Sequence, residues 1–484
     1  MFRFTVGLKK RKKMKIKKYI DALAPFPVFR VVNALTDEIG MRAFVIGGFV
    51  RDYFLGIPND DIDIVVEGSG IKFAEAFAEK VGGELTVYEN FGTAMVKFGY
   101  QKIEFVGARK EHYERGSRKP YCENGTLHDD QLRRDFTINA MAFDLNTGHY
   151  GELVDPFGGI GDLAVGIIRT PIDPVQTFLD DPLRMLRAIR FRCKLSRPGR
   201  EFHIAIPTMA AIQKCKEEIK TLSGERITEE MNKILASKKP SQGIMLLEQS
   251  GLLTYILPEV YYLRMPKDKG HKDIFDHTTR VLDNVANMSD NLYLRWAALL
   301  HDIGKVPTKK YDEKEGWTFY GHAAAGAKMV EKIFRRLHLP MDKAAYVEKL
   351  VDMHMRPTTL AEEGVSDSAI RRLLFDAGDD IDDLLLLAKC DVTTKYEERR
   401  TKIYENLLVI EKHIAEVEEK DAIRNFKNPI TGDYIMETFG IGPCKTIAVL
   451  KDAVKEAILD GVIGNNFEEA EVFVKEKAKE IGLV

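Results

Sequence analysis

Cysteine is scarce and scattered in this chain of 484 residues. The five cysteines never form the Cys-x-x-Cys spacing, so neither a zinc ribbon nor a disulfide framework is indicated, and a cytoplasmic location is expected. The sequence also lacks an apolar run long enough to cross a membrane. Charge of one sign is not in excess either, because the formal net charge is -2. No global basic field therefore indicates nucleic acid, although a local basic face would be enough to bind it.

The composition is that of a folded protein with several domains. Hydrophobic residues make up 45% and charged residues 30% of the chain. A chain of this length is too long for one ordinary core, so about two to four domains are expected. The first 18 residues include Lys9-Lys10-Arg11-Lys12-Lys13 and no apolar region of the secretory kind. We interpret them as a disordered basic extension, with an RNA-contacting arm as the alternative.

The spacing of apolar residues separates a small α+β head from a long helical remainder. Strands are predicted at residues 42–47, 61–67, 84–89, 93–98, 101–107 and 138–145, and helices at 48–56 and 70–81. A polar loop is expected over 109–134, and the pattern is helical from about residue 176 onward, with a linker at 258–270. The predicted fold class is α+β, with a mainly antiparallel mixed sheet in the head and a largely all-α remainder.

The most informative segment is Gly47-Gly48-Phe49-Val50-Arg51-Asp52, followed by Asp61-Ile62-Asp63. Because alternate side chains of a strand share a face, Asp61 and Asp63 project the same way. Paired carboxylates suit Mg²⁺ when a nucleotide supplies further oxygen ligands, and the glycines allow a triphosphate to approach the backbone at a helix start. The pattern predicts phosphoryl or nucleotidyl transfer. Glu104 on a neighbouring strand is a candidate third acid, with a solvated strand residue as the alternative.

Arginines at two further places are candidates for nucleotide contacts. Arg133 and Arg134 begin the string Arg-Arg-Asp-Phe-Thr-Ile-Asn-Ala-Met, and arginine forks suit phosphate oxygens, although a surface basic pair is the alternative. A helix is predicted over 181–191, with Pro182 in its first turn and an acid as cap. This spacing places Arg184, Arg187 and Arg190 on one face of that helix.

The pair Asp181 and Arg184 is either a surface salt bridge or a protein template for a nucleobase. Cytosine and adenine both present an amino donor beside a ring-nitrogen acceptor, which a carboxylate and an arginine can match. Uracil and guanine present a carbonyl and an N–H there, so both contacts would become repulsive. The template interpretation therefore predicts use of CTP and ATP and rejection of UTP and GTP.

Taken in order, these motifs resemble those of the bacterial-type (class II) CCA-adding tRNA nucleotidyltransferases and their poly(A) polymerase relatives. The resemblance spans about residues 20–265 and includes Asp155-Pro156-Phe157-Gly158-Gly159 and Gly224-Glu225-Arg226. It implies that Asp61 and Asp63 bind Mg²⁺ and that Asp181 with Arg184 forms the base template. The template motif commonly starts Glu-Asp, whereas Asp180 stands first here. The loop from Arg109 to Leu127, which is absent from members that add only CC, implies addition of the terminal A.

The remaining nucleotide-binding residues assigned within this resemblance come from the same motifs. They are Gly47, Gly48, Arg51, Arg133, Arg134, Asp135, Asn139, Arg187 and Arg190.

A second set of candidate ligands lies further along the chain and resembles the HD phosphohydrolase domain. Its members are His277, His301, Asp302 and Asp391, with His322 and His354 matching the extra histidines of dinuclear relatives. The resemblance implies a divalent transition metal (Ni, Mn, Co or Fe) or Mg²⁺, a metal-bound water as nucleophile, and phosphatase or cyclic phosphodiesterase activity. Lys305 could neutralise an oxyanion. The alternative is a degenerate domain that serves only as a tRNA-binding body.

The expected domains follow from these assignments. They are a basic extension (1–18), a nucleotidyltransferase head (19–150), a helical neck that selects nucleotides and binds RNA (151–265), an HD domain (271–400) and a helical tRNA-binding tail (401–484). The expected function is template-independent addition or repair of the 3′ CCA of tRNA from CTP and ATP, by a monomer or homodimer.

Three other functions remain open at this point. Poly(A) polymerase is the close alternative, because the head motifs are shared. An HD phosphohydrolase whose head only binds nucleotide, and a non-enzymatic RNA-binding protein, are alternatives of other classes.

Overall fold

The computed structural model describes residues 18–89, 92–112, 121–264, 273–363, 366–421, 423–424 and 426–483. The expected basic extension, apart from its last residue, and the tip of the 109–127 loop lie outside these ranges. The chain divides into two compact units, Met1–Thr221 and Leu222–Val484, and each is described by itself. The part of the chain that the structure describes contains no helix with both the length and the apolar character that crossing a bilayer requires.

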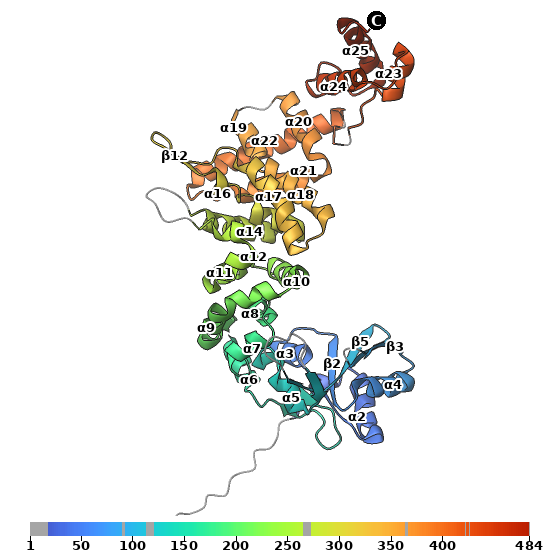
Figure 1. Cartoon of the computed structure of the whole chain (residues 1–484), viewed down its shortest axis with the longest axis vertical. Helices are drawn as coiled ribbons and strands as arrows, with labels where there is room; N and C mark the ends of the chain where they lie inside the picture. Colours follow the sequence, from blue (N-terminus) through green and yellow to red (C-terminus); the bar gives the residue numbers. More distant parts are fainter. Residues whose placement is uncertain are drawn as a thin grey trace, which may run out of the picture. The chain divides into compact units, whose positions relative to one another are not determined.

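The first unit is built on a seven-stranded mixed sheet (Figure 1). In spatial order its strands are β3 (Glu84–Tyr88), β4 (Thr93–Phe98), β5 (Gln101–Gly107), β2 (Asp61–Glu67), β1 (Arg42–Ile46), β8 (Ala142–Asp144) and β9 (Leu153–Val154). Neighbouring strands run antiparallel except for β2 and β5, which run parallel. The predicted mainly antiparallel mixed sheet is confirmed.

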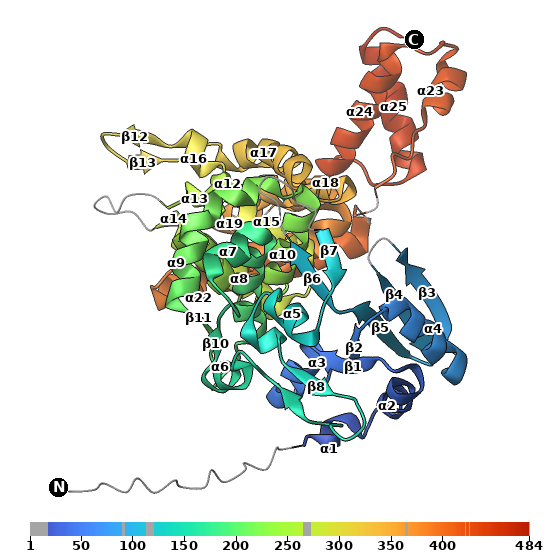
Figure 2. The same ribbon diagram turned by 60° about the horizontal axis from the view of Figure 1, so that its bottom comes forward.

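Three helices of the head end at a glycine in the left-handed conformation. They are α2 (Val28–Ile39), α3 (Gly48–Leu55) and α4 (Gly70–Val81). The Ser69 side chain accepts a hydrogen bond from the Lys72 N–H at the start of α4, and Gly82 ends this helix with a φ of 67°. Figure 2 shows α4 covering β3, β4 and β5. Phe73 and Phe77 of α4 pack on Phe105 with ring centroids 5.7 and 5.0 Å apart, which fixes β5 beneath the helix.

The polar segment after β5 is more regular than the predicted loop. It forms an antiparallel hairpin from β6 (Arg109–His112) and β7 (Tyr121–Asn124), followed by α5 (Leu127–Leu132). A reciprocal capping box between Thr126 and Asp129 begins α5. The strand predicted at 138–145 is also shorter than expected. A 3-10 turn, η2 (Thr137–Asn139), replaces its first part, since the Asn139 amide bonds back to the Asp135 carboxylate.

The predicted helix over 181–191 is shifted along the chain. Residues Pro174–Asp180 form α7, and α8 runs Leu183–Leu195. Asp181 between them is extended and accepts a hydrogen bond from the Leu183 N–H at 3.2 Å. Pro182, and not the predicted acid, holds the N-cap position of α8, although the Asp181 carboxylate still bonds to the first turn; the helix begins two residues later than predicted. Other neck elements are α6 (Gly159–Val165), β10 (Ile167–Ile168), β11 (His203–Ile204) and α9 (Ile206–Cys215).

Within its described residues, the second unit has helices and one short hairpin, β12 (Lys310–Asp312) and β13 (Gly316–Thr318). Its first helices are α10 (Gly224–Leu235), α11 (Pro240–Ser250), α12 (Leu253–Ile256) and α13 (Pro258–Tyr261). The last of these occupies the start of the predicted 258–270 linker, whose second half lies outside the described residues.

The helices around the HD ligands form one layered body. They are α14 (Ile274–Met288), α15 (Leu292–Leu300), α16 (Lys305–Thr308), α17 (His322–Leu337), α18 (Met341–Met353), α19 (Arg356–Glu363), α20 (Asp367–Ala377), α21 (Ile381–Asp391) and α22 (Glu397–Asp421). The chain then continues through α23 (Gly432–Phe439), α24 (Lys445–Leu459) and α25 (Phe467–Glu480). Residues Leu294 to Leu300 of α15 are all buried, which makes α15 the centre of the body and carries His301 into its interior.

Two candidate active sites

Strand pairing brings the three predicted acids of the head together. The parallel register of β2 and β5 places Asp61 opposite Lys102 and Asp63 opposite Glu104. Since side chains alternate along a strand, Asp61, Asp63 and Glu104 share one face of the sheet. Asp61 and Glu104 are exposed, whereas Asp63 is half-buried.

The glycine turn after β1 completes this site. Gly47 has a φ of 80°, which only glycine adopts without strain. A Cβ atom there would lie 3.0 Å from Nη1 of Arg134 and 3.8 Å from Oδ2 of Asp63. The absence of a side chain at Gly47 therefore lets the Arg134 guanidinium and the Asp63 carboxylate approach the backbone at the start of α3.

The electrostatics of the acids favour a cation. Burial raises the pKa of Asp63, and the opposing effect of Arg134 is too weak to cancel it. The neighbouring carboxylates Asp61 and Glu104 add to the rise, so that the pKa of Asp63 is about 6. Burial and then Asp61 likewise raise the pKa of Glu104. The three carboxylates repel one another, and a bound cation would relieve this repulsion. Mg²⁺ prefers oxygen ligands of this kind.

A buried acid that the sequence interpretation missed holds both arginines of the Arg-Arg pair. Asp130 of α5 has no exposed side-chain surface and accepts hydrogen bonds from Nε of Arg133 at 2.9 Å and Nε of Arg134 at 3.1 Å. Although burial raises the pKa of Asp130, the two guanidinium groups lower it below its usual range. The spacing of i, i+3 and i+4 on a helix is the signal that could have identified this residue.

Arg51, Asn139 and Asp135 form a chain of buried hydrogen bonds instead of an open surface. The Arg51 guanidinium donates to Asp52 at 2.7 and 2.8 Å and to Oδ1 of the Asn139 side chain at 2.7 Å. The Asn139 amide donates to Asp135 at 2.9 Å, and Asp135 accepts from Arg187 of α8 at 2.7 Å. The network therefore connects the helix that follows the glycine turn to the helix that carries the expected base template.

The template residues lie at the junction of α7 and α8. Both Asp181 and Arg184 are half-buried. Arg184 donates to the carbonyl oxygens of Thr177 at 3.3 Å and Arg133 at 2.6 Å, which couples it to the Arg-Arg pair. The carboxylate of Asp181 accepts from the Leu183 N–H. The structure thus gives each residue a backbone partner, and their contact with a base remains a prediction.

Phe191 of α8 is a further residue to which the sequence interpretation gave no role. Three predicted nucleotide-binding arginines surround its ring, with guanidinium carbons 5.2 Å (Arg51), 5.5 Å (Arg187) and 4.4 Å (Arg190) from the centroid. Cation–π attraction at a buried ring restrains three positive charges that would otherwise repel one another. Phe191 therefore orders the basic face of α8.

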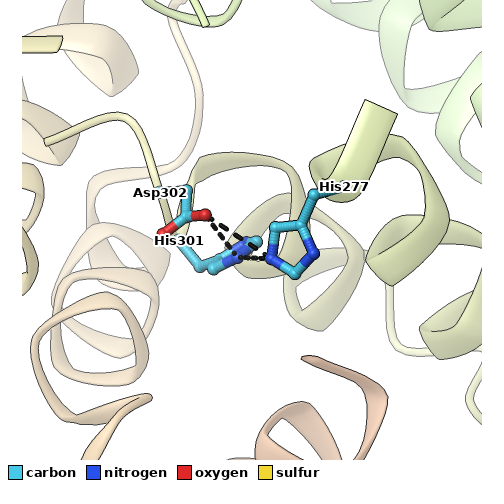
Figure 3. Close-up of side chains that lie close together, drawn as sticks. All are labelled: His277, His301 and Asp302. Carbon is cyan, nitrogen blue, oxygen red and sulfur yellow. Dashed lines mark hydrogen bonds and ion pairs between the residues drawn. The ribbon is translucent and has the colours of Figure 1, made fainter. Parts of the chain in front are cut away.

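The second site is a cluster of imidazole and carboxylate groups inside the second unit. His277 of α14 meets His301 and Asp302, which follow α15 (Figure 3). Nε2 of His277 lies 3.4 Å from Nε2 of His301, 3.5 Å from Oδ2 of Asp302 and 2.9 Å from Oδ1 of Asp391. Nε2 of His301 lies 3.3 Å from Oδ2 of Asp302.

Asp302 joins this group to a second one. Its Oδ1 atom lies 3.5 Å from Nε2 of His322 and 4.0 Å from Nε2 of His354. His277, His301 and Asp302 form one group with metal-ligand spacing, and Asp302, His322 and His354 form another. The structure thus brings all six predicted ligands together, with Asp302 in both groups and Asp391 beside the first.

The outer nitrogen of each histidine is held by a neighbour. Three of them contact backbone carbonyls, which only accept, so Nδ1 carries the proton there: His301 with Ala298 at 2.8 Å, His354 with Val351 at 2.7 Å, and His322 with Phe319 at 3.0 Å. Nδ1 of His277 lies 2.7 Å from the Thr393 hydroxyl. Such contacts fix ring orientation and direct Nε2 inward, as expected for metal ligands.

Buried donor atoms without partners test whether a metal would fit. Among the described residues, Oδ1 of Asp302 and Nε2 of His322 and His354 are buried and make no hydrogen bond. Burial lowers the pKa of His301, but Asp302 and Asp391 outweigh it and raise that pKa to about 10. Burial and the nearby His301 lower the pKa of His354 to about 4. These buried acceptor atoms lack partners and lie beside carboxylates that favour positive charge. One or two divalent cations would therefore fit among them.

Close backbone packing keeps the second group in place. A Cβ atom at Gly304 would overlap the carbonyl oxygen of His322 at the start of α17. Lys305, the next residue, donates to Oδ2 of Asp302 at 2.7 Å. The Gly-Lys dipeptide after His301 and Asp302 therefore sets both the position of His322 and one charge neighbour of Asp302.

Three families match successive parts of the chain. The family described as "Poly A polymerase head domain" matches residues 43–169. "Probable RNA and SrmB- binding site of polymerase A" matches residues 201–263, and "HD domain" matches residues 274–394. The first match contains the acids of the head, and the third contains the six candidate ligands of the second site.

Longer matches are found to curated proteins and to solved structures. The chain is 35% identical over 330 residues to a "Multifunctional CCA protein" of Neisseria meningitidis, covering 65% of this chain and 73% of that protein. It is 32% identical over 338 residues to an "A-adding tRNA nucleotidyltransferase" of Geobacter sulfurreducens, covering 69% of this chain but 35% of that relative. A solved complex of a CCA-adding enzyme with ATP is 26% identical, with a TM-score of 0.65 over 96% of this chain and 100% of that one.

Proposed function

The chain belongs to the family of CCA-adding tRNA nucleotidyltransferases with an HD domain, and from this membership we propose that it adds or repairs the 3′-terminal CCA of tRNA using CTP and ATP. The observation that carries the proposal is the shared face of Asp61, Asp63 and Glu104 beside the glycine turn and Arg134. That arrangement pairs an acidic cation site with a basic phosphate site.

The residues of the head divide this work between them. Asp61 and Asp63 would hold Mg²⁺, with Glu104 as a third acid on the adjacent strand. Divalent cations at such sites neutralise the triphosphate and favour both the attacking and the leaving oxygen. Arg134, held by Asp130, is oriented toward the backbone at Gly47, where the triphosphate would lie. Positioning and electrostatic stabilisation are the main contributions that a protein makes to this chemistry.

Base selection is assigned to the junction of α7 and α8. Asp181 would accept the amino hydrogen of cytosine or adenine, and Arg184 would donate to the ring nitrogen. The hydrogen bond from Arg184 to the Arg133 carbonyl oxygen links selection of the base to the segment that binds the triphosphate. Arg51, Asp135 and Asn139 act as positioning residues in the buried network, and Arg187 and Arg190 present positive charge around Phe191.

One assay distinguishes CCA addition from the A-adding and poly(A) polymerase activities. The protein is incubated with Mg²⁺ and either a tRNA that ends at the discriminator base or one that already ends in CC, with CTP and ATP separately and together. We expect growth by three nucleotides and then arrest. Addition of A only to tRNA that already ends in CC would identify an A-adding enzyme, and open-ended addition of A would identify a poly(A) polymerase.

We propose a second function, metal-dependent phosphoester hydrolysis, for the six-residue HD cluster. Its support is the convergence of four histidine Nε2 atoms and two carboxylates. The Nδ1 atom of each of these histidines is already held by a neighbour. His277, His301, Asp302 and Asp391 would hold one ion, and His322 with His354 would add a second through Asp302; Ni, Mn, Co, Fe and Mg²⁺ are the candidates. Hydrolysis of p-nitrophenyl phosphate in the presence of each metal tests this function, and its absence with every metal would contradict it.

The remaining assignments concern tRNA and assembly. We propose that the neck (151–265) and the helical tail (401–484) contact tRNA and that the protein acts as a monomer or homodimer. Cross-linking of tRNA to the tail, with light scattering for the molar mass, tests both.

A further inference from the structure

A cavity of about 440 Å³ lies beside the HD cluster within the second unit. Its lining includes two of the proposed ligands, His277 and Asp391, together with Lys305. The segment that follows Asp391, Val392 to Thr394, also lines it. A ligand in this cavity would therefore touch the cluster directly, and the size lies within the range of about 300–1,000 Å³ that small-molecule sites occupy.

One cation of this cavity differs from its neighbours. Arg399, in the first turn of α22, lines the cavity and is exposed. Lys305 is engaged by Asp302 at 2.7 Å, and the adjacent Arg400 is engaged by Glu397 at 3.4 Å. Arg399 makes no hydrogen bond or ion pair with any residue that the structure describes. Its guanidinium is thus the cavity's uncommitted group with the charge and the fork geometry that a phosphate requires.

The rest of the lining has a different character. Phe319, Ile403, Ile274 and Val392 contribute apolar surface. Apolar walls with a few placed polar groups are typical of sites that bind an organic molecule and orient it by its polar end. A phosphate ester with a ring or nucleoside-sized group attached would satisfy both parts of this lining.

We propose that Arg399 positions the phosphate of the substrate in the HD cavity and that the apolar walls receive the ester's organic group. This inference rests on the phosphohydrolase function proposed for the cluster. Arg399 follows Asp391 and Thr393 closely in the chain, and Thr393 contacts Nδ1 of His277. The same short segment therefore fixes two proposed ligands and carries the arginine into the cavity.

The test measures binding without requiring turnover. Phenylphosphonate, a non-hydrolysable phosphate mimic with an apolar ring, is titrated calorimetrically into the full-length protein, both metal-free and with Mn²⁺. We expect Arg399→Ala to weaken binding about tenfold or more, since a charge-assisted hydrogen bond is lost. Arg399→Lys should restore part of the affinity, and Arg400→Ala, the matched control on the same turn, should leave it unchanged. Phenylphosphonate that binds to an anion site of the head does so equally in all variants, so it does not affect the difference between their dissociation constants.

Two results would overturn the assignment: no binding of phenylphosphonate to the unmodified protein, or equal dissociation constants for the Arg399→Ala and Arg400→Ala variants. Steady-state hydrolysis of p-nitrophenyl phosphate provides a second measurement, in which Arg399→Ala should raise KM more than it lowers kcat. If the ester is hydrolysed but Arg399→Ala changes neither affinity nor KM, the positioning role fails and the proposed hydrolase remains. If binding depends on Arg399 but no metal supports hydrolysis, the hydrolase fails and the anion site remains.

Discussion

The two clusters of acids differ in how completely the protein alone builds them. In the head, Asp61 and Glu104 lie exposed on one face of a sheet and only Asp63 is half-buried. In the HD region, His301, Asp302 and His354 are each at most 1% exposed, and the outer nitrogen of each of the four histidines is held by a neighbour. The head thus offers carboxylates that a nucleotide must complete, whereas the HD cluster is a nearly closed ligand set.

This difference has a physical reason. A nucleotidyltransferase must admit a triphosphate and an RNA end at every cycle, so its acids need access from solvent. A cluster of four imidazoles and two carboxylates can supply most ligands of a metal ion by itself and gains rigidity from burial. Burial raises the pKa of Asp63 and lowers that of His354 because in each case it disfavours the charged form.

The largest effect is expected from removing an acid of the head. Asp63→Ala should reduce addition of CTP to tRNA by at least about a thousandfold, because the cation site loses its half-buried ligand. Asp60→Ala, which alters the exposed acid just before β2, is the matched control and should keep nearly full activity. Gel analysis of tRNA extended by labelled nucleotide measures both. Substantial addition by the Asp63 variant would place the catalytic acids elsewhere.

The next effect concerns retention of metal in the HD cluster. His354→Ala should lower the metal content of protein purified in Mn²⁺ or Ni²⁺, since one of the two groups around Asp302 loses a ligand. His338→Ala offers a control in the same unit, because His338 pairs with Glu225 away from the cluster. Elemental analysis gives the metal content, and equal content in both variants would argue against the second group.

A smaller effect on nucleotide addition is expected from changing Asp130, because this residue positions two arginines and does not itself contact the nucleotide. Asp130→Asn should lower kcat/KM for CTP and ATP by about ten- to a hundredfold, because Arg133 and Arg134 lose the charge that orients them. The neighbouring acid Asp129, which is half-buried and bonds to Thr126 instead of the arginines, provides the control variant Asp129→Asn. Assays run well below the melting temperature separate this effect from instability. An unchanged kcat/KM would mean that the two arginines do not need Asp130.

The smallest effect is a pH dependence of stability in the metal-free head. The pKa of Asp63 is raised to about 6, above its ordinary value of 3.8, so the folded state binds a proton there more tightly than the unfolded state. Ionisation of Asp63 therefore lowers stability as the pH rises from about 4 through 6. Asp63→Asn should raise the melting temperature at pH 8 and have little effect at pH 4. Thermal melts in EDTA at the two values measure it, and an equal effect at both would contradict the raised pKa.

The sequence was sufficient for the parts of the molecule that local patterns specify. The alternation in 61–67 and 101–107 predicted both strands. The cluster of His301, Asp302 and Asp391, which the fold assembles, was implied by the resemblance to the HD domain. It was less informative where side chains compete with the backbone. The bond from Asn139 to Asp135 accompanies the shortened strand, and the bond from the Leu183 N–H to Asp181 accompanies the shifted helix start. Asp130 was missed because its i, i+3 and i+4 spacing to Arg133 and Arg134 does not reveal that the acid is buried.

The most direct test of the account is a crossed assay of the two sites. Asp63→Ala and His301→Ala are each assayed for addition of CCA to tRNA and for hydrolysis of p-nitrophenyl phosphate, with circular dichroism to confirm folding. The account predicts that Asp63→Ala loses addition and keeps hydrolysis, and that His301→Ala keeps addition and loses hydrolysis. Loss of CCA addition in a folded His301→Ala protein would contradict the claim that the head and the HD cluster are separate metal centres.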